Sequence, residues 1–148
     1  MTASKDPIAL RILTEAGIIS QLSQAMLEKA LPDGLKVSQF TVLNHLVRLG
    51  GKWAPLRLAN AFQVTSGAMT NTLKRLLARG LITLEEDPDD GRAKLVGLTP
   101  EGEAMRGRCI EAIGPLIYEI NNLITEEEAA AALPVLQKIR AHLDAKRG

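Results

Sequence analysis

The chain has 148 residues, with 18 Lys and Arg against 17 Asp and Glu, one Cys and 3% aromatic residues. This length suggests one domain, which can fold on apolar packing without disulfides or a structural metal. The longest apolar run, residues 129–136, is far shorter than the roughly 20 residues that span a bilayer, and Lys5, Asp6 and Arg11 interrupt any signal peptide, so we expect a cytoplasmic protein with no membrane partner.

The first part of the chain is predicted to form two helices. Apolar residues at three- and four-residue steps predict a long helix from Ile8 to Ala30. A turn at residues 31–34, which contains Pro and Gly, ends this helix. Ser38 is expected to cap a second helix, which stops at Gly50-Gly51.

The next two predicted helices are joined by a tight turn. Pro55 fits the first position of a short third helix, residues 56–62. Residues 63–65 form the turn, and a fourth helix runs over residues 66–79 with its apolar positions on one face. A short helix, a tight turn and a longer helix form the outline of a helix-turn-helix, although any helical hairpin in a bundle has the same outline.

A two-stranded ribbon is predicted after the helix-turn-helix. Residues 81–84 and 93–98 have the composition of strands, and residues 87–91, Asp-Pro-Asp-Asp-Gly, that of a hairpin turn. Such a ribbon in this position is a wing, and a wing favours a DNA-binding domain over a simple helical hairpin of a bundle.

Two helices complete the predicted fold. Thr99-Pro100 starts a long fifth helix whose apolar positions continue to Ile120, with the lone Cys109 buried on its apolar face. Thr125 and Glu128 have the spacing of a capping box, which opens a sixth helix. The predicted fold class is therefore mainly α with a small β-wing: a winged helix-turn-helix with two helices, an optional short strand, two helices, two strands and two final helices.

The distribution of charge supports this interpretation. A net charge of +1 at first argues against DNA, since a basic domain is the usual electrostatic signature of a DNA-binding protein. Residues 53–84, however, hold four basic residues and no acidic one, whereas residues 85–94 hold two basic and five acidic residues. The positive charge is thus concentrated on the helix-turn-helix, where it can neutralise phosphates. The alternative is an ordinary solvated face, which usually mixes both signs.

The fourth helix carries small and amide side chains opposite its apolar face. Asn can pair with adenine, and Thr can contact a thymine methyl group. The backbone amides at Ser66 and Gly67 can hold a phosphate, while Thr65 or Ser66 has the competing role of capping the helix. The predicted DNA contacts of the helix-turn-helix are Arg57, Thr65, Ser66, Gly67, Thr70, Asn71, Lys74 and Arg75.

Five runs of the chain form a recognisable set: Val64 to Asn71, Leu73 to Leu76, Gly80 to Ile82, Asp87 to Arg92 and Leu98 to Gly102. The most specific feature is the Asp-Gly-Arg tip of the predicted wing, followed by Leu-Thr and then Gly. In this order the runs resemble the multiple-antibiotic-resistance regulator (MarR) family of bacterial transcription factors, over nearly the whole chain.

The resemblance implies a single domain, residues 1–148, which acts as a homodimer. Residues 36–99 would bind DNA, and residues 1–35 and 100–148 would form the dimer interface. Such dimers bind pseudo-palindromic operators in double-stranded DNA, with the recognition helix, here residues 66–79, in the major groove.

The resemblance also assigns roles within the wing. Arg92 would enter the minor groove, and Lys94 is the only other basic side chain of the wing that can reach DNA. Relatives often carry further arginines here, so we expect a weaker wing contact. Asp90 commonly helps to hold the wing, and a pairing with Arg75 or Arg92 would do so.

Many relatives release DNA when a small, often aromatic, acid binds between the dimerisation and DNA-binding parts. We therefore expect a repressor that is released by a small aromatic or phenolic effector. His45 and Trp53 lie near the family's pocket region and are the candidate effector contacts. The alternative is that both are packing residues.

Other classes of function receive little support. The chain has no Gly-rich phosphate loop and no spacing typical of a catalytic triad or dyad, so we predict that it is not an enzyme. Two distant histidines, His45 and His142, and one cysteine predict no metal site and no cofactor. A winged-helix module that binds proteins instead of DNA is the alternative that the near-neutral charge and the acidic wing permit.

Overall fold

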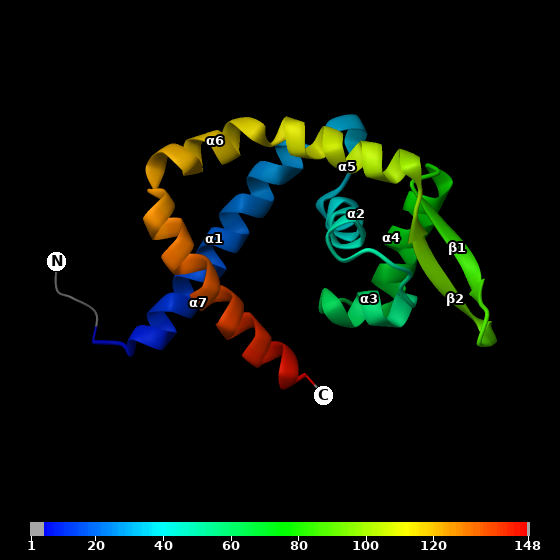
Figure 1. Ribbon diagram of the computed structural model, residues 1–148, viewed down its shortest axis with the longest axis horizontal. Helices are drawn as coiled ribbons and strands as arrows, with labels where there is room; N and C mark the ends of the chain where they lie inside the picture. The colour runs from blue at the N-terminus through cyan, green and yellow to red at the C-terminus, as the bar shows by residue number, and fades with distance from the viewer. Residues whose placement is uncertain (1–4, 148) are drawn as a thin grey trace. The chain divides into compact units, whose positions relative to one another are not determined.

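The computed structural model describes residues 5–147, so residues 1–4 and 148 of the predicted domain lie outside it. The chain divides into two compact units, one that ends at Ala112 and one that begins at Ile113. The first unit holds five α-helices, a single 3₁₀ turn and both strands (Figure 1). In chain order these are α1 (Ile8–Ala30), η1 (Pro32–Gly34), α2 (Val37–Leu49), α3 (Pro55–Ala61), α4 (Ser66–Ala78), β1 (Ile82–Asp87), β2 (Asp90–Leu98) and α5 (Pro100–Ala112).

Helix α1 has the predicted bounds, but none of its residues, all of which are described, is buried. It ends where Leu31 takes an extended conformation ahead of Pro32, and the Leu31 N–H donates to the Leu27 carbonyl at 2.9 Å. Its apolar positions include Ile19 and Leu22, each 62% exposed, so this helix has an apolar face that its own unit leaves uncovered.

Helix α2 begins two residues earlier than a cap at Ser38 predicts. Its N-cap is Lys36, whose backbone N–H donates to Oε1 of Gln39 at 3.1 Å. The prediction that Ser38 caps this helix is therefore wrong: the Gln39 side chain satisfies the free amide, and Ser38 lies inside the first turn. The helix ends at Leu49 because Gly50 has a φ of 65°.

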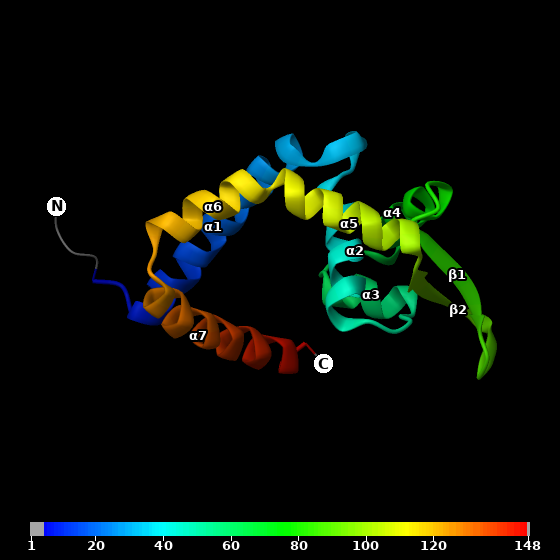
Figure 2. The same cartoon turned by 45° about the horizontal axis from the view of Figure 1, so that its top comes forward.

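Helix α2 lies at the centre of the core, and it contacts α1, α4, α5 and β2 (Figures 1 and 2). The core of this unit is built from apolar side chains of α2, α3, α4 and both strands, and its most deeply buried members include Leu43, Leu46, Leu58, Leu76, Ile82 and Val96. Burying each such side chain stabilises the fold by about 1.5–3 kcal/mol. The core therefore fixes α3, α4 and the strands relative to one another.

The wing is an antiparallel hairpin whose register places Ile82 opposite Leu98. Its tip is held by two carboxylates: Oδ1 of Asp87 accepts from the Asp89 N–H at 2.9 Å, and Oδ1 of Asp90 accepts from the Arg92 N–H at 3.1 Å. The optional short strand is present as one isolated bridge, between Trp53 and Val96.

The junction between the wing and α5 depends on Thr99. The hydroxyl oxygen of Thr99 accepts from the Gly102 N–H at 3.0 Å, as predicted for an N-cap, and the hydroxyl donates to the Gly80 carbonyl at 2.7 Å. Cys109 is fully buried in α5, also as predicted, and burial raises the pKa of its thiol. A buried thiol with a raised pKa is unreactive.

The predicted single fifth helix is wrong, because the structure has two helices there. Helix α5 ends at Ala112, and α6 (Gly114–Leu123) begins after Ile113. Pro115 cannot donate a helical hydrogen bond, and its ring would clash with the preceding turn of a continuous helix. The apolar spacing continued across this break, so periodicity alone could not detect it.

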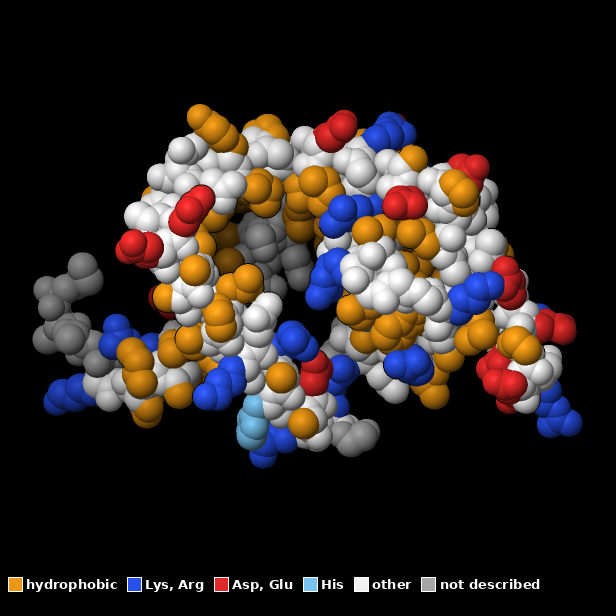
Figure 3. All heavy atoms as spheres, viewed as in Figure 1, with side chains coloured by type: hydrophobic (Ala, Val, Ile, Leu, Met, Phe, Trp, Pro, Cys, Tyr) orange, Lys and Arg blue, Asp and Glu red, His pale blue; other side chains and the backbone are white. Residues whose placement is uncertain are grey.

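The second unit consists of α6 and α7 (Glu126–Ala145). The predicted capping box is present: the Glu128 N–H donates to Oγ1 of Thr125 at 3.1 Å, and the Thr125 N–H donates to Oε1 of Glu128 at 3.0 Å. No residue of either helix, both fully described, is buried, and hydrophobic side chains lie at the surface along α7 (Figure 3). Among the described residues, no helix is long and apolar enough to cross a membrane.

Candidate nucleic-acid interface

Helix α4 is fixed by one cap and one apolar face. The hydroxyl oxygen of Thr65 accepts from the Ala68 N–H at 3.1 Å, so Thr65, and not Ser66, is the N-cap. Met69, Leu73 and Leu76 are buried against the core. Because the spacing of these three residues fixes the rotation of α4 about its axis, the opposite face is presented to solvent.

The exposed face of α4 carries the predicted base-reading residues. Gly67, Thr70, Asn71 and Lys74 are all exposed. A Cβ added at Gly67 would meet no atom within 4 Å, so packing within the protein does not require glycine there. A glycine on an open helix face permits close approach of another molecule's backbone.

Basic side chains of the helix-turn-helix and the wing tip are free of carboxylates. None of the ion pairs within residues 5–147 involves Lys74, Arg75 or Arg92. All three side chains are exposed. Their charges are therefore available to phosphates without the cost of separating an internal pair.

Two of the five acidic side chains of the wing form ion pairs within the protein. Glu85 forms an ion pair with Lys52, and Glu86 pairs with Lys94 at 3.6 Å. Figure 3 shows acidic side chains gathered over the wing and a basic side chain at its far end. The predicted DNA contact Lys94 thus has a carboxylate partner already.

Asp90 has a structural role, as predicted, and its partner is Arg92, one of the two residues that were predicted. Its carboxylate accepts the backbone N–H of Arg92, and within the described residues it forms no ion pair with either predicted guanidinium, that of Arg75 or that of Arg92. The pairing of Asp90 with Arg92 is thus made through the backbone N–H of Arg92 and not through its guanidinium. Because Asp90 lies only two residues before Arg92, its short side chain reaches the local backbone more easily than a distant guanidinium.

A second group of predicted residues forms an aromatic cluster at the start of α3. The His45 ring lies edge-on to Trp53, with ring centroids 4.5 Å apart, and to Phe62, at 5.1 Å. The guanidinium carbon of Arg57 lies 4.4 Å from the centroid of the Trp53 ring. This arrangement brings the predicted DNA contact Arg57 together with both predicted effector contacts.

His45 is buried, at 8% exposure, and its Nε2 has no hydrogen-bond partner within the described residues. Burial, followed by the positive charges of Arg48 and Arg57, lowers the pKa of His45. The imidazole is therefore neutral at neutral pH, and it packs as an aromatic ring.

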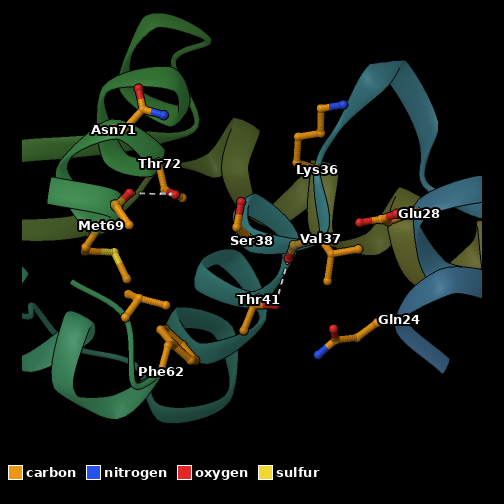
Figure 4. Close-up of a pocket in the computed structure, with 12 residues that line it drawn as sticks. Gln24, Glu28, Lys36, Val37, Ser38, Thr41, Phe62, Met69, Asn71 and Thr72 are labelled. Carbon is orange, nitrogen blue, oxygen red and sulfur yellow. Dashed lines mark hydrogen bonds between the residues drawn. The ribbon is translucent and has the colours of Figure 1, made fainter. Parts of the chain in front are cut away.

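A cavity of about 700 Å³ adjoins α4 within the first unit (Figure 4). Its floor is apolar, with Val37, Phe62 and Met69, and the charged side chains of Glu28 and Lys36 lie at its edge. The other lining residues are Gln24, Ser38, Thr41, Val64, Ala68, Asn71 and Thr72.

The cavity was not predicted from the sequence. Gln24 and Glu28, which both line it, are four residues apart and therefore lie on one side of α1, and this spacing is the one sequence signal that could have pointed to the cavity. His45 and Trp53 do not line the cavity, although Phe62 both lines it and contacts the His45 ring. The assignment of His45 and Trp53 as effector contacts stays a prediction. Among the described residues, no group of three or more His, Cys, Asp or Glu is placed to hold a metal ion.

Comparison with known proteins identifies related sequences and structures. The family model described as "MarR family" matches residues 33–93. The multiple antibiotic resistance protein MarR of Salmonella typhimurium is 33% identical over 124 residues, which cover 82% of this chain and 85% of the relative.

Solved structures have the same fold. A cysteine-to-serine mutant of MarR from Escherichia coli, complexed with operator DNA, has a TM-score of 0.71 at 27% identity, over 93% of this chain and 99% of that chain. The transcriptional regulator BldR from Sulfolobus solfataricus has a TM-score of 0.81 at 24% identity, over 95% of this chain and 99% of that chain, and this likeness concerns the fold alone.

Proposed function

Because the chain belongs to the MarR family of DNA-binding transcriptional regulators, which are not enzymes, we propose that it acts in the cytoplasm as a repressor and binds a pseudo-palindromic operator as a homodimer. The observation that carries this proposal is the exposed face of α4. There Asn71 and Lys74 lie on one open surface of a helix-turn-helix that has no carboxylate of its own.

In this proposal α4 enters the major groove. Thr70 and Asn71 read base edges, and Lys74 and Arg75 contact phosphates or guanine. The amides of Ser66 and Gly67, at the positive end of the helix dipole, hold a phosphate. Arg92, which has no ion-pair partner within residues 5–147, enters the adjacent minor groove.

The exposed apolar residues support a homodimer. Helix α1 leaves Ile8, Ile19, Leu22 and Met26 exposed, and α7 has further exposed leucines. Large contiguous apolar surfaces on a soluble domain mark interfaces. A second copy of the chain would cover such a face with the same apolar residues. The twofold symmetry of the resulting dimer would match the symmetry of a pseudo-palindromic operator.

Alanine substitutions test the proposed DNA contacts. Asn71→Ala is expected to cost about 1–3 kcal/mol at one base position and to relax sequence preference there. Lys74→Ala should instead weaken binding to all sequences and lower the slope of log K against log salt by about 1. Arg92→Ala should weaken binding through loss of the minor-groove contact.

The measurement is a titration of operator and scrambled duplexes at several salt concentrations. Lys138→Ala in α7 is the matched control, because it removes the same charge from an exposed helical position outside the helix-turn-helix and wing. Wild-type binding by Asn71→Ala, Lys74→Ala and Arg92→Ala together would contradict the assignment.

A winged-helix module that binds proteins is the second candidate. The observation that favours it is the acidic wing, where Glu85 and Glu86 already form ion pairs with Lys52 and Lys94. If the wild-type protein fails to shift its own promoter even at low salt, where phosphate contacts are strongest, this second candidate is the better one.

We also propose that a small aromatic acid binds in the cavity between α1, α2 and α4 and releases the DNA. The apolar floor suits an aromatic ring, and the Lys36 ammonium suits a carboxylate. A ligand there would contact Asn71, the same residue that is proposed to read the operator.

A thermal-shift titration with benzoate tests the cavity as the effector site. At a concentration 100 times Kd the ligand would stabilise the protein by about 2.7 kcal/mol, which raises Tm by roughly 2–4 °C per kcal/mol. Lys36→Ala should remove the shift, and Lys29→Ala, an exposed lysine of α1 that does not line the cavity, should keep it. A shift that survives Lys36→Ala but disappears in Trp53→Ala would place the effector at Trp53 instead.

A further inference from the structure

Trp53 is fixed from three directions. Its indole Nε1–H donates to the Gly50 carbonyl at 2.8 Å. Its backbone pairs with Val96 of β2, through N–H to carbonyl distances of 3.0 and 2.8 Å. The His45 ring, 4.5 Å away, packs edge-on against it. The indole ring therefore has one orientation relative to α3 and the wing.

His45 holds this ring from the interior. Its imidazole lies between Trp53 and Phe62 and is 92% buried, and its Nε2 has no partner within residues 5–147. A histidine in that position contributes its shape and its aromatic face to the packing. The packing of His45 thus holds the Trp53 ring in a fixed position.

Arg57, an exposed residue, lies over the same indole ring. Its guanidinium carbon is 4.4 Å from the ring centroid, and Arg57 takes part in none of the ion pairs within the described residues. A guanidinium that lies over an aromatic ring is held by its attraction to the ring face, while its N–H donors remain able to bind a phosphate. The Trp53 ring thus orients a guanidinium that forms no ion pair with any carboxylate of the described residues.

In the proposed mode of DNA binding, the position of the stack suits one strand of the duplex. Helix α3 contacts both α4 and β2, and Trp53 is bridged to β2, so the stack lies at the junction between the helix-turn-helix and the wing (Figures 1 and 2). A duplex with α4 in its major groove and the wing in the adjacent minor groove passes one phosphate backbone across that junction. The charge and the donor geometry of Arg57 suit that backbone.

We propose that Trp53 is a positioning residue for DNA binding: it holds the Arg57 guanidinium over its indole ring, so that the guanidinium meets the phosphate backbone between the two grooves. This role rests on the proposed mode of DNA binding. The benefit is preorganisation, because an arginine that is already ordered loses less side-chain freedom when it binds phosphate.

A double-mutant cycle on operator affinity tests the proposal. Arg57→Ala should weaken binding by about tenfold and lower the slope of log K against log salt by about 1. Trp53→Leu should weaken binding by about threefold to fivefold in the presence of Arg57 and have no further effect on Arg57→Ala. Trp53→Tyr keeps an aromatic face and should restore near-wild-type affinity, which a role in packing alone does not predict.

The control and a second readout separate this role from others. Arg48→Ala removes the other cation whose charge acts on His45 but leaves the stack intact, so its salt slope should be unchanged. Trp53 is the only tryptophan of the chain, so its fluorescence reports the stack directly. Operator addition should change this fluorescence in the wild type and not in Arg57→Ala.

Three results would overturn the proposal. They are an Arg57→Ala variant that binds like the wild type, strictly additive effects of Arg57→Ala and Trp53→Leu, and a Trp53→Tyr variant as weak as Trp53→Leu with an unchanged melting temperature. Failure of the wild type and Lys138→Ala to bind any duplex would instead refute the proposed function itself.

Discussion

Replacing Gly102 with alanine is expected to lower the free energy of unfolding by about 3 kcal/mol or more. A Cβ at this position would lie 2.0 Å from the Leu81 carbonyl oxygen and 2.8 Å from Cδ1 of Leu98. The carbonyl belongs to the backbone between α4 and β1, so it cannot rotate away as a side chain could. The start of α5 must move away from the strands instead, which breaks the contact that joins them.

Equilibrium unfolding in urea, followed by helical circular dichroism at a fixed protomer concentration, measures this effect. Gly107→Ala is the matched control in the same helix, because a Cβ there meets no atom within 4 Å. It should stabilise the protein by about 0.5–1 kcal/mol, as glycine-to-alanine changes in helices do. Equal stability of the two variants would show that α5 does not approach the Leu81 backbone as closely as described.

Two glutamates on the apolar face of α1, in the variant Ile19→Glu with Leu22→Glu, are expected to produce a monomer and to lower operator affinity by about 100-fold or more. Each of the two side chains is 62% exposed, so the change removes no core contact within one chain. In the proposed dimer, however, it buries charges without partners. A monomer engages one half-site and loses the gain from linking two.

Analytical ultracentrifugation and an operator titration on the same sample check this prediction. Gln21→Glu adds a charge to an exposed position of the same helix, on a different side from Ile19 and Leu22, and should leave both the mass and the affinity unchanged. A dimer that persists in the double variant would place the interface elsewhere. A monomer that keeps full affinity would separate dimerisation from operator binding.

Features set by neighbouring residues were predictable from the sequence. The capping box of Thr125 with Glu128, the Thr99 cap and the wing turn each depend on side chains that meet the backbone two or three residues away. The buried face of α4 followed from a single helical period. The exposed face that carries Asn71 and Lys74 is the complement of that period, so the centre of the candidate site was also readable from the sequence.

Features that depend on a choice between neighbours, or on contacts between distant segments, were not predictable. Ser38 was a good capping residue, but Gln39 already satisfied the Lys36 amide. The break at Pro115 interrupts a helix whose apolar spacing is continuous. The ion pair of Glu85 with Lys52 joins residues 33 positions apart, and no spacing rule connects them. The cavity likewise depends on three helices packing together.

The ion pair between Lys94 and Glu86 changes what a wing contact with DNA would be. When a free lysine binds a phosphate, a cation that was condensed on the DNA returns to solution. When Lys94 does so, it first leaves Glu86, and separating an exposed ion pair costs about 0–1 kcal/mol. Salt screens this internal pair as well as the contact with phosphate, so the cost of separating the pair falls as salt rises. The contribution of Lys94 to DNA binding should therefore fall less steeply with salt than that of a lysine without a carboxylate partner.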